Sequence, residues 1–280
     1  MGLTVDLWPG QEIGFLLVHG LASNARLWDG VAAWLNGVGH AVAALDQRGH
    51  GRSDKPDHGY DLATACDDLV AVLAALRAGP RGGDGAWRRP VVVGQSWGAN
   101  VALEVAWRHP GLTAGVVCVD GGTNDLADRF PTWEACATVL APPPLAGTPA
   151  ADFETAVRTR HPDWPEPGIQ ATLANVEFRA DGTVAPWLTS DRHMLILRSL
   201  YEHRPSTRFA GIREAVLLVP ADTGDETWTA AKRAGVATAL AALRRSRARW
   251  FAPADHDLHA QFPDQLAMVL SGATVEGLFG

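Results

Sequence analysis

The stretch Pro90-Val-Val-Val-Gly-Gln-Ser-Trp-Gly98 decides the fold class of this chain. An apolar run leads directly into a turn of the form G-x-S-x-G, and a helical pattern follows the turn as far as Trp107. A buried strand that turns tightly into a helix presents the middle residue of the turn at the carboxyl end of a sheet. Gly94 and Gly98 leave room for the strained backbone that such a turn requires. The pattern therefore predicts Ser96 as an exposed nucleophile.

Apolar runs alternate with helical patterns on both sides of this stretch, which predicts βαβ units around a parallel sheet. The predicted core strands cover residues 14–18, 41–45, 90–93, 114–119, 215–219 and about 247–251. The predicted helices cover 28–38, 61–77, the segment after the turn, a long alanine-rich stretch to about 243, and 264–270. The Gly/Arg-rich segment 79–89 is expected to form a surface connection. The expected fold is an α/β fold, with a mostly parallel central sheet and helices on both faces.

Two further features complete the predicted architecture. About thirteen residues precede the first core strand, which is enough for one antiparallel strand rather than two. The strand rhythm stops over residues 123–209, where short helical patterns and the run Pro142-Pro-Pro144 occur. We expect an α/β core over 1–122 and 210–280, and a helical cap insertion over 123–209. The insertion contains tryptophans that either line a pocket for an apolar ligand or pack in the core: Trp133, Trp164 and Trp187.

Composition narrows the function classes. With 280 residues, 47% hydrophobic and 20% charged, the chain fits one globular unit with a sizeable core. The formal net charge of −7 argues against nucleic acid or an anionic membrane as partner. Residues 1–10 lack the pattern of a signal peptide, and no apolar stretch is long enough to span a bilayer. Three scattered cysteines, Cys66, Cys118 and Cys136, fit neither a disulfide framework nor a metal site, which predicts a reducing cytoplasm.

The base that would activate the serine is sought C-terminal to it. A serine hydroxyl is a poor nucleophile at neutral pH unless a general base takes its proton. His256 follows the last predicted strand and is the candidate. His259 is its rival, but it lies one helical turn later, so position favours His256.

The acid that would orient the imidazole is less sharply indicated. Asp225, Asp120 and Asp222 each lie beyond the carboxyl end of a predicted strand, and each satisfies the chain order Ser–Asp–His. Asp225 lies in a loop just before a helix, and Asp222 is placed to cap the turn. Asp120 directly follows its strand, as either the acid or a structural hydrogen-bonding residue. The sequence ranks Asp225 first, Asp120 second and Asp222 third.

An oxyanion hole requires two convergent N–H donors. One is expected from Trp97, directly after the nucleophile. The other is expected from the loop His19-Gly20-Leu21-Ala22, most directly from the backbone of Leu21. Gly20 would let that backbone approach the ligand closely, and His19 would brace the loop without transferring protons.

These motifs together resemble the α/β-hydrolase superfamily, specifically its capped lipase, esterase and peroxidase-like branch. The motifs that carry the resemblance are His19-Gly20, Asp46-Gln-Arg-Gly-His-Gly-Arg-Ser53, Gly94-Gln-Ser-Trp-Gly98 and Asp255-His-Asp257. The resemblance covers nearly the whole chain except 123–209, which looks like the variable cap of the family. It implies that 46–53 is a structural loop and neither a phosphate nor a metal site.

The chain departs from the family pattern at two points. Gln95 stands where the family usually has His or another residue, which should alter the support of the turn rather than the class of reaction. The acid usually lies in a strand–Gly-x-x-Asp pattern, which 220–225 does not reproduce. Asp120 therefore remains a candidate, because some relatives place the acid at that position.

The resemblance implies hydrolysis of an ester or lactone through an acyl-enzyme, on a small to medium, largely apolar small-molecule substrate. No metal or organic cofactor is required. Family members with an aspartate nucleophile open epoxides or displace halide, and Ser96 argues against both. Alternatives on the same residues are hydrolysis of a carbon–carbon, thioester or amide bond, or perhydrolysis. An alternative of another class is a ligand-binding protein that retains the site with little turnover. The intact Ser–His pair argues against this alternative.

Overall fold

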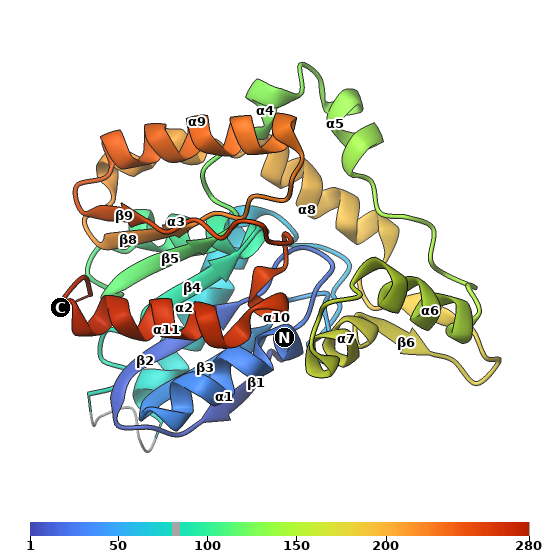
Figure 1. Cartoon of the computed structure of the whole chain (residues 1–280), viewed down its shortest axis with the longest axis horizontal. Coiled ribbons are helices and arrows are strands. Elements are labelled where there is room, and N and C mark those ends of the chain that lie inside the picture. The colour runs from blue at the N-terminus through green and yellow to red at the C-terminus, as the bar shows by residue number, and fades with distance from the viewer. Residues whose placement is uncertain (80–84, 280) are drawn as a thin grey trace.

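A seven-stranded sheet forms the centre of the computed structural model, which describes residues 1–79 and 85–279 (Figure 1). The strand order is β1-β3-β2-β4-β5-β8-β9, and only β1 runs antiparallel to its neighbour. The strands are β1 (Thr4–Trp8), β2 (Glu12–Val18), β3 (His40–Asp46), β4 (Val91–Gln95), β5 (Gly115–Val119), β8 (Ala215–Val219) and β9 (Ser246–Ala248). The predicted α/β fold class is confirmed. The connection predicted over 79–89 lies partly outside the described residues.

Helices cover both faces of the sheet because successive side chains of a strand point to opposite faces. In β2, Phe15 and Leu17 face one apolar cluster, and Leu16 and Val18 face another. The first cluster includes side chains of α1 (Asp29–Gly37) and α11 (Pro263–Val275). The second includes side chains of α2 (Leu62–Ala78), α3 (Trp97–Arg108) and α9 (Glu226–Ala242). Within the described ranges no helix is both long and apolar enough to cross a bilayer.

Two predicted elements differ from the structure at their ends. The helix expected from residue 28 is preceded by a 3-10 turn, η1 (Ala25–Trp28), because the Asn24 side chain accepts a hydrogen bond from the Arg26 N–H and starts the turn early. The strand expected over 247–251 is shorter than predicted. After β9 only an isolated bridge, between Ala221 and Phe251, extends the pairing.

The insertion between β5 and β8 is mainly helical and contributes most of the side chains of two small apolar clusters. Its elements are α4 (Leu126–Arg129), α5 (Trp133–Leu140), α6 (Ala150–Arg160), α7 (Glu166–Leu173), β6 (Val176–Phe178), β7 (Val184–Pro186) and α8 (Ser190–Glu202), followed by the 3-10 turns η3 (Pro205–Thr207) and η4 (Phe209–Gly211). One cluster joins α4, α5 and α8, and the other joins α6, α7, β6 and β7 (Figure 1).

The antiparallel pair β6–β7 corrects the expectation that no buried strand lies in 123–209. Each strand has three residues, which is too short for the alternation of apolar and polar residues to stand out in the sequence. Val176 and Val184 nevertheless bury their side chains in the cluster with α6 and α7. A strand pair of this size is stabilised by packing against helices rather than by its own hydrogen bonds.

Candidate active site

Ser96 occupies the tight turn between β4 and α3. Its backbone has φ +52° and ψ −119°, a left-handed conformation that is unfavourable for a residue with a side chain. A Cβ atom at Gly94 would collide with the backbone of Gly98, so the turn tolerates only glycine there. The Ser96 N–H still donates to the Val119 carbonyl at 2.9 Å. The sheet therefore holds the serine at its edge despite the strain.

Asp120 occupies the equivalent point of the neighbouring strand. Gln95 pairs with Val119 in the β4–β5 register, so Ser96 and Asp120 are the next residues of the two strands. Asp120 also has a positive φ, +41°, and its N–H donates to the Val219 carbonyl of β8 at 2.9 Å. Two strained residues thus stand side by side at the carboxyl edge of the sheet.

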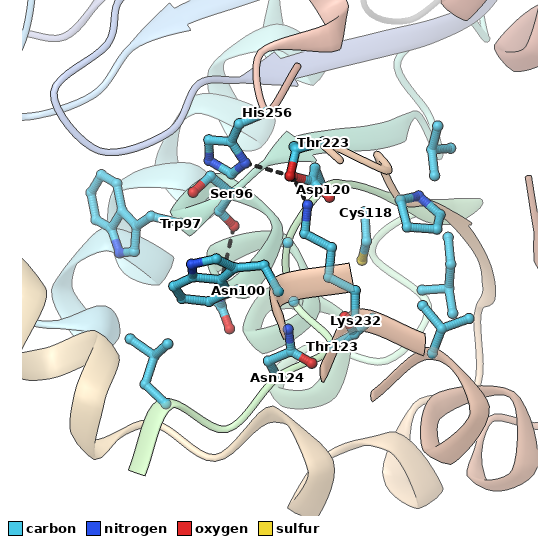
Figure 2. Close-up of a pocket in the computed structure, with 18 of the residues that line it drawn as sticks. Ser96, Trp97, Asn100, Cys118, Asp120, Thr123, Asn124, Thr223, Lys232 and His256 are labelled. Atoms are coloured by element: carbon cyan, nitrogen blue, oxygen red, sulfur yellow. Dashed lines mark hydrogen bonds and ion pairs between the residues drawn. The ribbon is translucent and has the colours of Figure 1, made fainter. Parts of the chain in front are cut away.

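Figure 2 shows His256 beside both of these residues. Its Nδ1 lies 2.6 Å from Asp120 Oδ2, and the buried carboxylate also accepts a hydrogen bond from the Ala221 N–H at 2.9 Å. Figure 2 shows the other ring nitrogen on the side of the Ser96 hydroxyl. Burial lowers the pKa of His256, but the hydrogen bond and charge of Asp120 raise it above its ordinary value. The neutral ring, with its proton on Nδ1, presents an acceptor nitrogen toward the serine.

The rival histidine, His259, has a different environment. It is fully buried in α10 (Leu258–Gln261), with its ring centroid 4.3 Å from that of Trp28. Burial lowers the pKa of His259 to about 4. Neither ring nitrogen has a hydrogen-bond partner among the described residues. His259 is therefore a packing residue, and the contact with an aspartate belongs to His256.

The structure does not bring Asp225, which the sequence ranks first as the acid, into contact with His256. The exposed Asp225 carboxylate accepts the Trp228 N–H at 3.0 Å and caps the start of α9. Asp222 accepts from the Gly224 N–H at 3.1 Å and the Thr229 hydroxyl at 3.0 Å. Both follow β8, which lies one strand farther from β4 than β5 does. Asp120, ranked second, follows the adjacent strand and reaches His256.

Lys232 is part of this site, although the sequence reasoning missed it. Its Nζ donates to Asp120 Oδ2 at 2.8 Å and to the Ala221 carbonyl at 2.9 Å. Burial raises the pKa of Asp120, but the hydrogen bonds and charges of His256 and Lys232 outweigh burial and hold it below its ordinary value. One sequence signal marks the position: only two of the 24 basic side chains are lysines, Lys55 and Lys232.

The loop that carries His256 is held from the core and from the insertion. The Gln95 side-chain amide donates to the His256 carbonyl at 3.2 Å, which gives the unusual residue before the serine a supporting contact. The neighbouring Asp255 carboxylate accepts from Trp164 Nε1 of the insertion at 2.6 Å, and His161 Nδ1 lies 3.3 Å from the same oxygen. The insertion thus contacts the residue directly before His256.

Two buried histidines brace the loop 19–22. His19 Nδ1 donates to the Gly20 carbonyl at 2.7 Å, and its Nε2 accepts from the Gln47 N–H at 3.0 Å. His50 Nε2 accepts from the Ala22 N–H at 3.2 Å. Burial lowers the pKa of both imidazoles, so each remains neutral and can accept as well as donate. The Leu21 N–H has no acceptor among residues 1–79 and 85–279.

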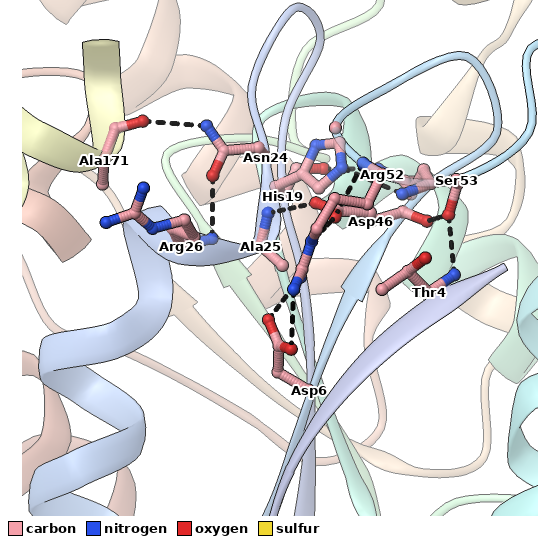
Figure 3. Close-up of polar contacts among 12 residues, drawn as sticks. Thr4, Asp6, His19, Asn24, Ala25, Arg26, Asp46, Arg52, Ser53 and Ala171 are labelled. Carbon is pink, nitrogen blue, oxygen red and sulfur yellow. Dashed lines mark hydrogen bonds and ion pairs between the residues drawn. The ribbon is translucent and has the colours of Figure 1, made fainter. Parts of the chain in front are cut away.

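The loop 46–53 continues this support (Figure 3). Asp46 accepts from the Ala25 N–H at 2.8 Å and from Arg52 Nε at 2.9 Å. The side-chain oxygen Oδ1 of Asn24 caps η1, and its Nδ2 donates to the Ala171 carbonyl of α7 at 2.8 Å. Asp46 thus holds the backbone at Ala25, and the adjacent Asn24 ties this segment to the insertion. In the described part of the chain, no group of three or more His, Cys, Asp or Glu side chains is placed to hold a metal ion.

A cavity of about 490 Å³ opens at Ser96, His256 and Asp120. Its polar lining comes from Asn100, Thr123, Asn124, Arg160, Thr223 and Lys232. Its larger apolar side chains are Trp97, Leu126, Leu140, Leu200, Leu218, Val219, Trp228 and Val236. None of the three insertion tryptophans singled out from the sequence lines this cavity. Trp164 packs with α6 and α7, Trp133 contacts Tyr201, and Trp187 lines a separate hollow.

Comparison with known proteins places this geometry in a family. A family model described as the alpha/beta hydrolase family matches residues 15–269. Epoxide hydrolase B of Mycobacterium tuberculosis is 38% identical over 104 residues, or 36% of this chain and 27% of the relative. The 2-(acetamidomethylene)succinate hydrolase of Mesorhizobium japonicum is 32% identical over 105 residues, or 38% of this chain and 34% of the relative. The matched segments therefore span about a third or less of these curated relatives.

Solved structures agree with the fold over almost the whole chain. The crystal structure of E-2-(acetamidomethylene)succinate hydrolase superposes with a TM-score of 0.74 at 22% identity, covering 96% of this chain and 94% of that one. A thioesterase domain from the curacin biosynthetic pathway gives a TM-score of 0.72 at 19% identity, covering 96% and 95%. At these identities the likeness shows the fold alone. Together with the family match, it establishes that this chain belongs to the alpha/beta hydrolase family.

Proposed function

We propose that this protein is a serine hydrolase that cleaves an ester or lactone bond through an acyl-enzyme, with Ser96, His256 and Asp120 as its triad. The observation that carries the proposal is the contact of His256 with Asp120 at 2.6 Å, beside a serine in a strained strand–helix turn. A base held by a buried carboxylate next to a presented hydroxyl is the arrangement that nucleophilic acyl transfer requires.

The reaction follows from the positions of these groups. Ser96 Oγ attacks the substrate carbonyl while His256 Nε2 takes the hydroxyl proton, and Asp120 stabilises the imidazolium. The N–H groups of Leu21 and Trp97 hold the oxyanion, since Trp97 is the first residue of α3 and its N–H has no acceptor within the helix. His256 then gives the proton to the leaving oxygen. A water molecule releases the acyl group by the same steps, without a cofactor.

The cavity supports a small-molecule substrate of small to medium size. Its volume of about 490 Å³ falls within the range of ligand pockets. Leucines from the insertion, Leu126, Leu140 and Leu200, line it together with Trp228. An apolar acyl or alcohol group would fill this part. Neither a nucleic acid nor a membrane is part of the proposal.

Amide hydrolysis at the same site is the second candidate, and Lys232 is the observation in its favour. A cation beside Asp120 makes the imidazolium of His256 a stronger acid. An amine is a poorer leaving group than an alcohol, so its departure depends more on protonation. An acidified imidazolium would favour that step.

We also propose a cytoplasmic location on the evidence of the cysteines. Cys66, Cys118 and Cys136 are all buried and unpaired in the described structure. Burial raises the pKa of the Cys66 thiol to about 12, which keeps it protonated and unreactive. Buried free thiols are common in reducing compartments, where disulfides are rare.

The test is hydrolysis of p-nitrophenyl acetate, butyrate and octanoate, together with a thioester and a p-nitroanilide. Wild type is compared with Ser96→Ala and His256→Ala, and with Ser190→Ala, which removes an exposed serine of the insertion. We expect turnover of at least one ester and a loss of about 10³-fold or more in the first two variants only. Equal rates in wild type and Ser96→Ala would contradict the proposal. Saturable ligand binding without turnover would favour the ligand-binding alternative.

A further inference from the structure

Lys232 and His256 both contact the same carboxylate oxygen of Asp120. Asp120 Oδ2 lies 2.6 Å from His256 Nδ1 and 2.8 Å from Lys232 Nζ, while the Ala221 N–H occupies Oδ1. The Asp120 side chain has no exposed surface, and that of Lys232 is 12% exposed. Figure 2 shows the ammonium group approaching the carboxylate from the side of α9, away from the imidazole. The acid of the proposed triad is thus part of a second buried ion pair.

The composition of the chain makes this lysine distinctive. Arginine supplies almost all of the basic side chains, and the next residue, Arg233, is an ordinary example. Its side chain is 69% exposed and lies 3.6 Å from Asp222. Lysine at 232 places a compact charge at the end of a flexible stem, and this charge reaches both Asp120 Oδ2 and the Ala221 carbonyl.

We propose that Lys232 is a positioning residue that sets how readily His256 takes up a proton. The proposal rests on the triad assigned under the proposed function. In the resting site Asp120 and Lys232 offset each other, and His256 is neutral. Proton transfer from Ser96 then creates a cation beside another cation. Compared with an Asp–His pair alone, His256 becomes a weaker base and, once protonated, a stronger acid toward the leaving group.

Other charged groups around His256 do not duplicate this effect. Asp257, next to it in the chain, acts in the opposite direction and favours the imidazolium. His259 is neutral, since burial lowers its pKa to about 4. Arg160 lines the same cavity but lies in an exposed part of the insertion. Lys232 is the cation that contacts the carboxylate directly.

The test compares four proteins: wild type, Lys232→Met, Lys232→Arg and Arg233→Met. Lys232→Met removes the charge but keeps an unbranched apolar stem, and Lys232→Arg keeps the charge. Arg233→Met is the matched control, because it removes a positive charge one residue away that does not touch Asp120. Two readouts are collected: the pH profile of kcat/KM on an ester, and a ¹⁵N-histidine NMR titration of the resting protein, with His256 assigned from the spectrum of His256→Gln.

We expect Lys232→Met to move the titration of His256, and with it the acid limb of kcat/KM, upward by about one pH unit. The reason is that loss of the nearby cation favours the imidazolium. At pH values below the pKa of His256, kcat/KM of the variant should be about tenfold lower than that of wild type. At higher pH the difference should be smaller. Lys232→Arg and Arg233→Met should titrate within about 0.3 unit of wild type, on the ground that one keeps the charge and the other is screened by solvent.

An unshifted His256 titration in folded Lys232→Met would overturn the proposal, as would a uniform loss of rate at every pH. If Lys232→Met does not fold, Lys232→Gln replaces it, because glutamine can still donate a hydrogen bond to Asp120. The upward shift of the His256 titration then decides the outcome in the same way. The NMR titration needs no substrate. Absence of turnover would therefore count against the proposed function and leave the titration to decide the role of Lys232.

Discussion

The carboxyl edge of the central sheet, here called the core edge, and the insertion hold their residues in place by different means. At the core edge, Ser96 and Asp120 each continue a ladder of backbone hydrogen bonds while adopting a positive φ. In the insertion, side chains make the attachments: Asn24 to the Ala171 carbonyl of α7, and Trp164 to Asp255. Backbone ladders fix reacting groups closely, whereas side-chain attachments allow the covering segment to vary. We therefore expect the edge to determine the chemistry and the insertion to select the substrate.

The largest expected effect separates the two aspartates at the edge. Asp120→Asn should lower kcat by about 10³- to 10⁴-fold, because an amide cannot hold the imidazole in the required tautomer or stabilise its cation. Asp225→Ala should leave kcat within about twofold and lower the free energy of unfolding by about 1 kcal/mol, since it removes only a helix cap. Ester hydrolysis and urea denaturation measure the two quantities. A large loss of kcat in Asp225→Ala would restore that residue as the acid.

The next effect compares a glycine of the core edge with one of the insertion. A Cβ at Gly20 would press on the Gln95 side chain and approach Ser96, so Gly20→Ala should displace the oxyanion loop and lower kcat by about 10²-fold. Gly182, at the β6–β7 turn, has φ +81° with nothing nearby to obstruct a Cβ. Gly182→Ala should cost about 1 kcal/mol of stability with kcat unchanged. Similar losses of kcat in both variants would erase the distinction between the regions.

The smallest effect probes the attachment between them. Trp164→Phe keeps an aromatic ring in the α6–α7 cluster but removes the donor to Asp255. Loosening the residue before His256 should lower kcat by about fivefold, corresponding to one hydrogen bond of about 1 kcal/mol. Trp133→Phe is the control, because Trp133 packs against Tyr201 elsewhere in the insertion. An unchanged kcat in Trp164→Phe would show that the insertion does not steady the histidine loop.

The sequence predicts those features of the site that a local pattern encodes, and it does not predict those that depend on the order of the strands. Ser96 was recognisable because a strained strand–helix turn demands glycines at fixed spacing, and the β2, β4, β5 and β8 runs because buried parallel strands are apolar throughout. The contact of Asp120 with His256 was not predictable with the same force. It depends on β5 lying between β4 and β8, an order that no local pattern encodes.

Lys232 and the insertion escaped prediction for related reasons. The contact between Lys232 and Asp120 joins residues 112 positions apart and requires α9 to place Lys232 beside Ala221, which lies just after β8. The three-residue strands β6 and β7 are too short for periodicity to reveal. The tryptophans of the insertion pack mainly within it, and Trp97 and Trp228 line the cavity instead. Composition identified the segment as different but not which side chains face the serine.

The most direct test of the central claim is covalent labelling by a fluorophosphonate, read by intact mass and peptide mapping. Such a reagent reacts with a serine that a neighbouring base activates, whatever the natural substrate is. We predict a single adduct on Ser96 in the wild type, none in Ser96→Ala, and labelling slowed by at least about 10²-fold in His256→Ala. An adduct on another residue, or undiminished labelling of Ser96→Ala, would contradict the assignment of Ser96 as the nucleophile.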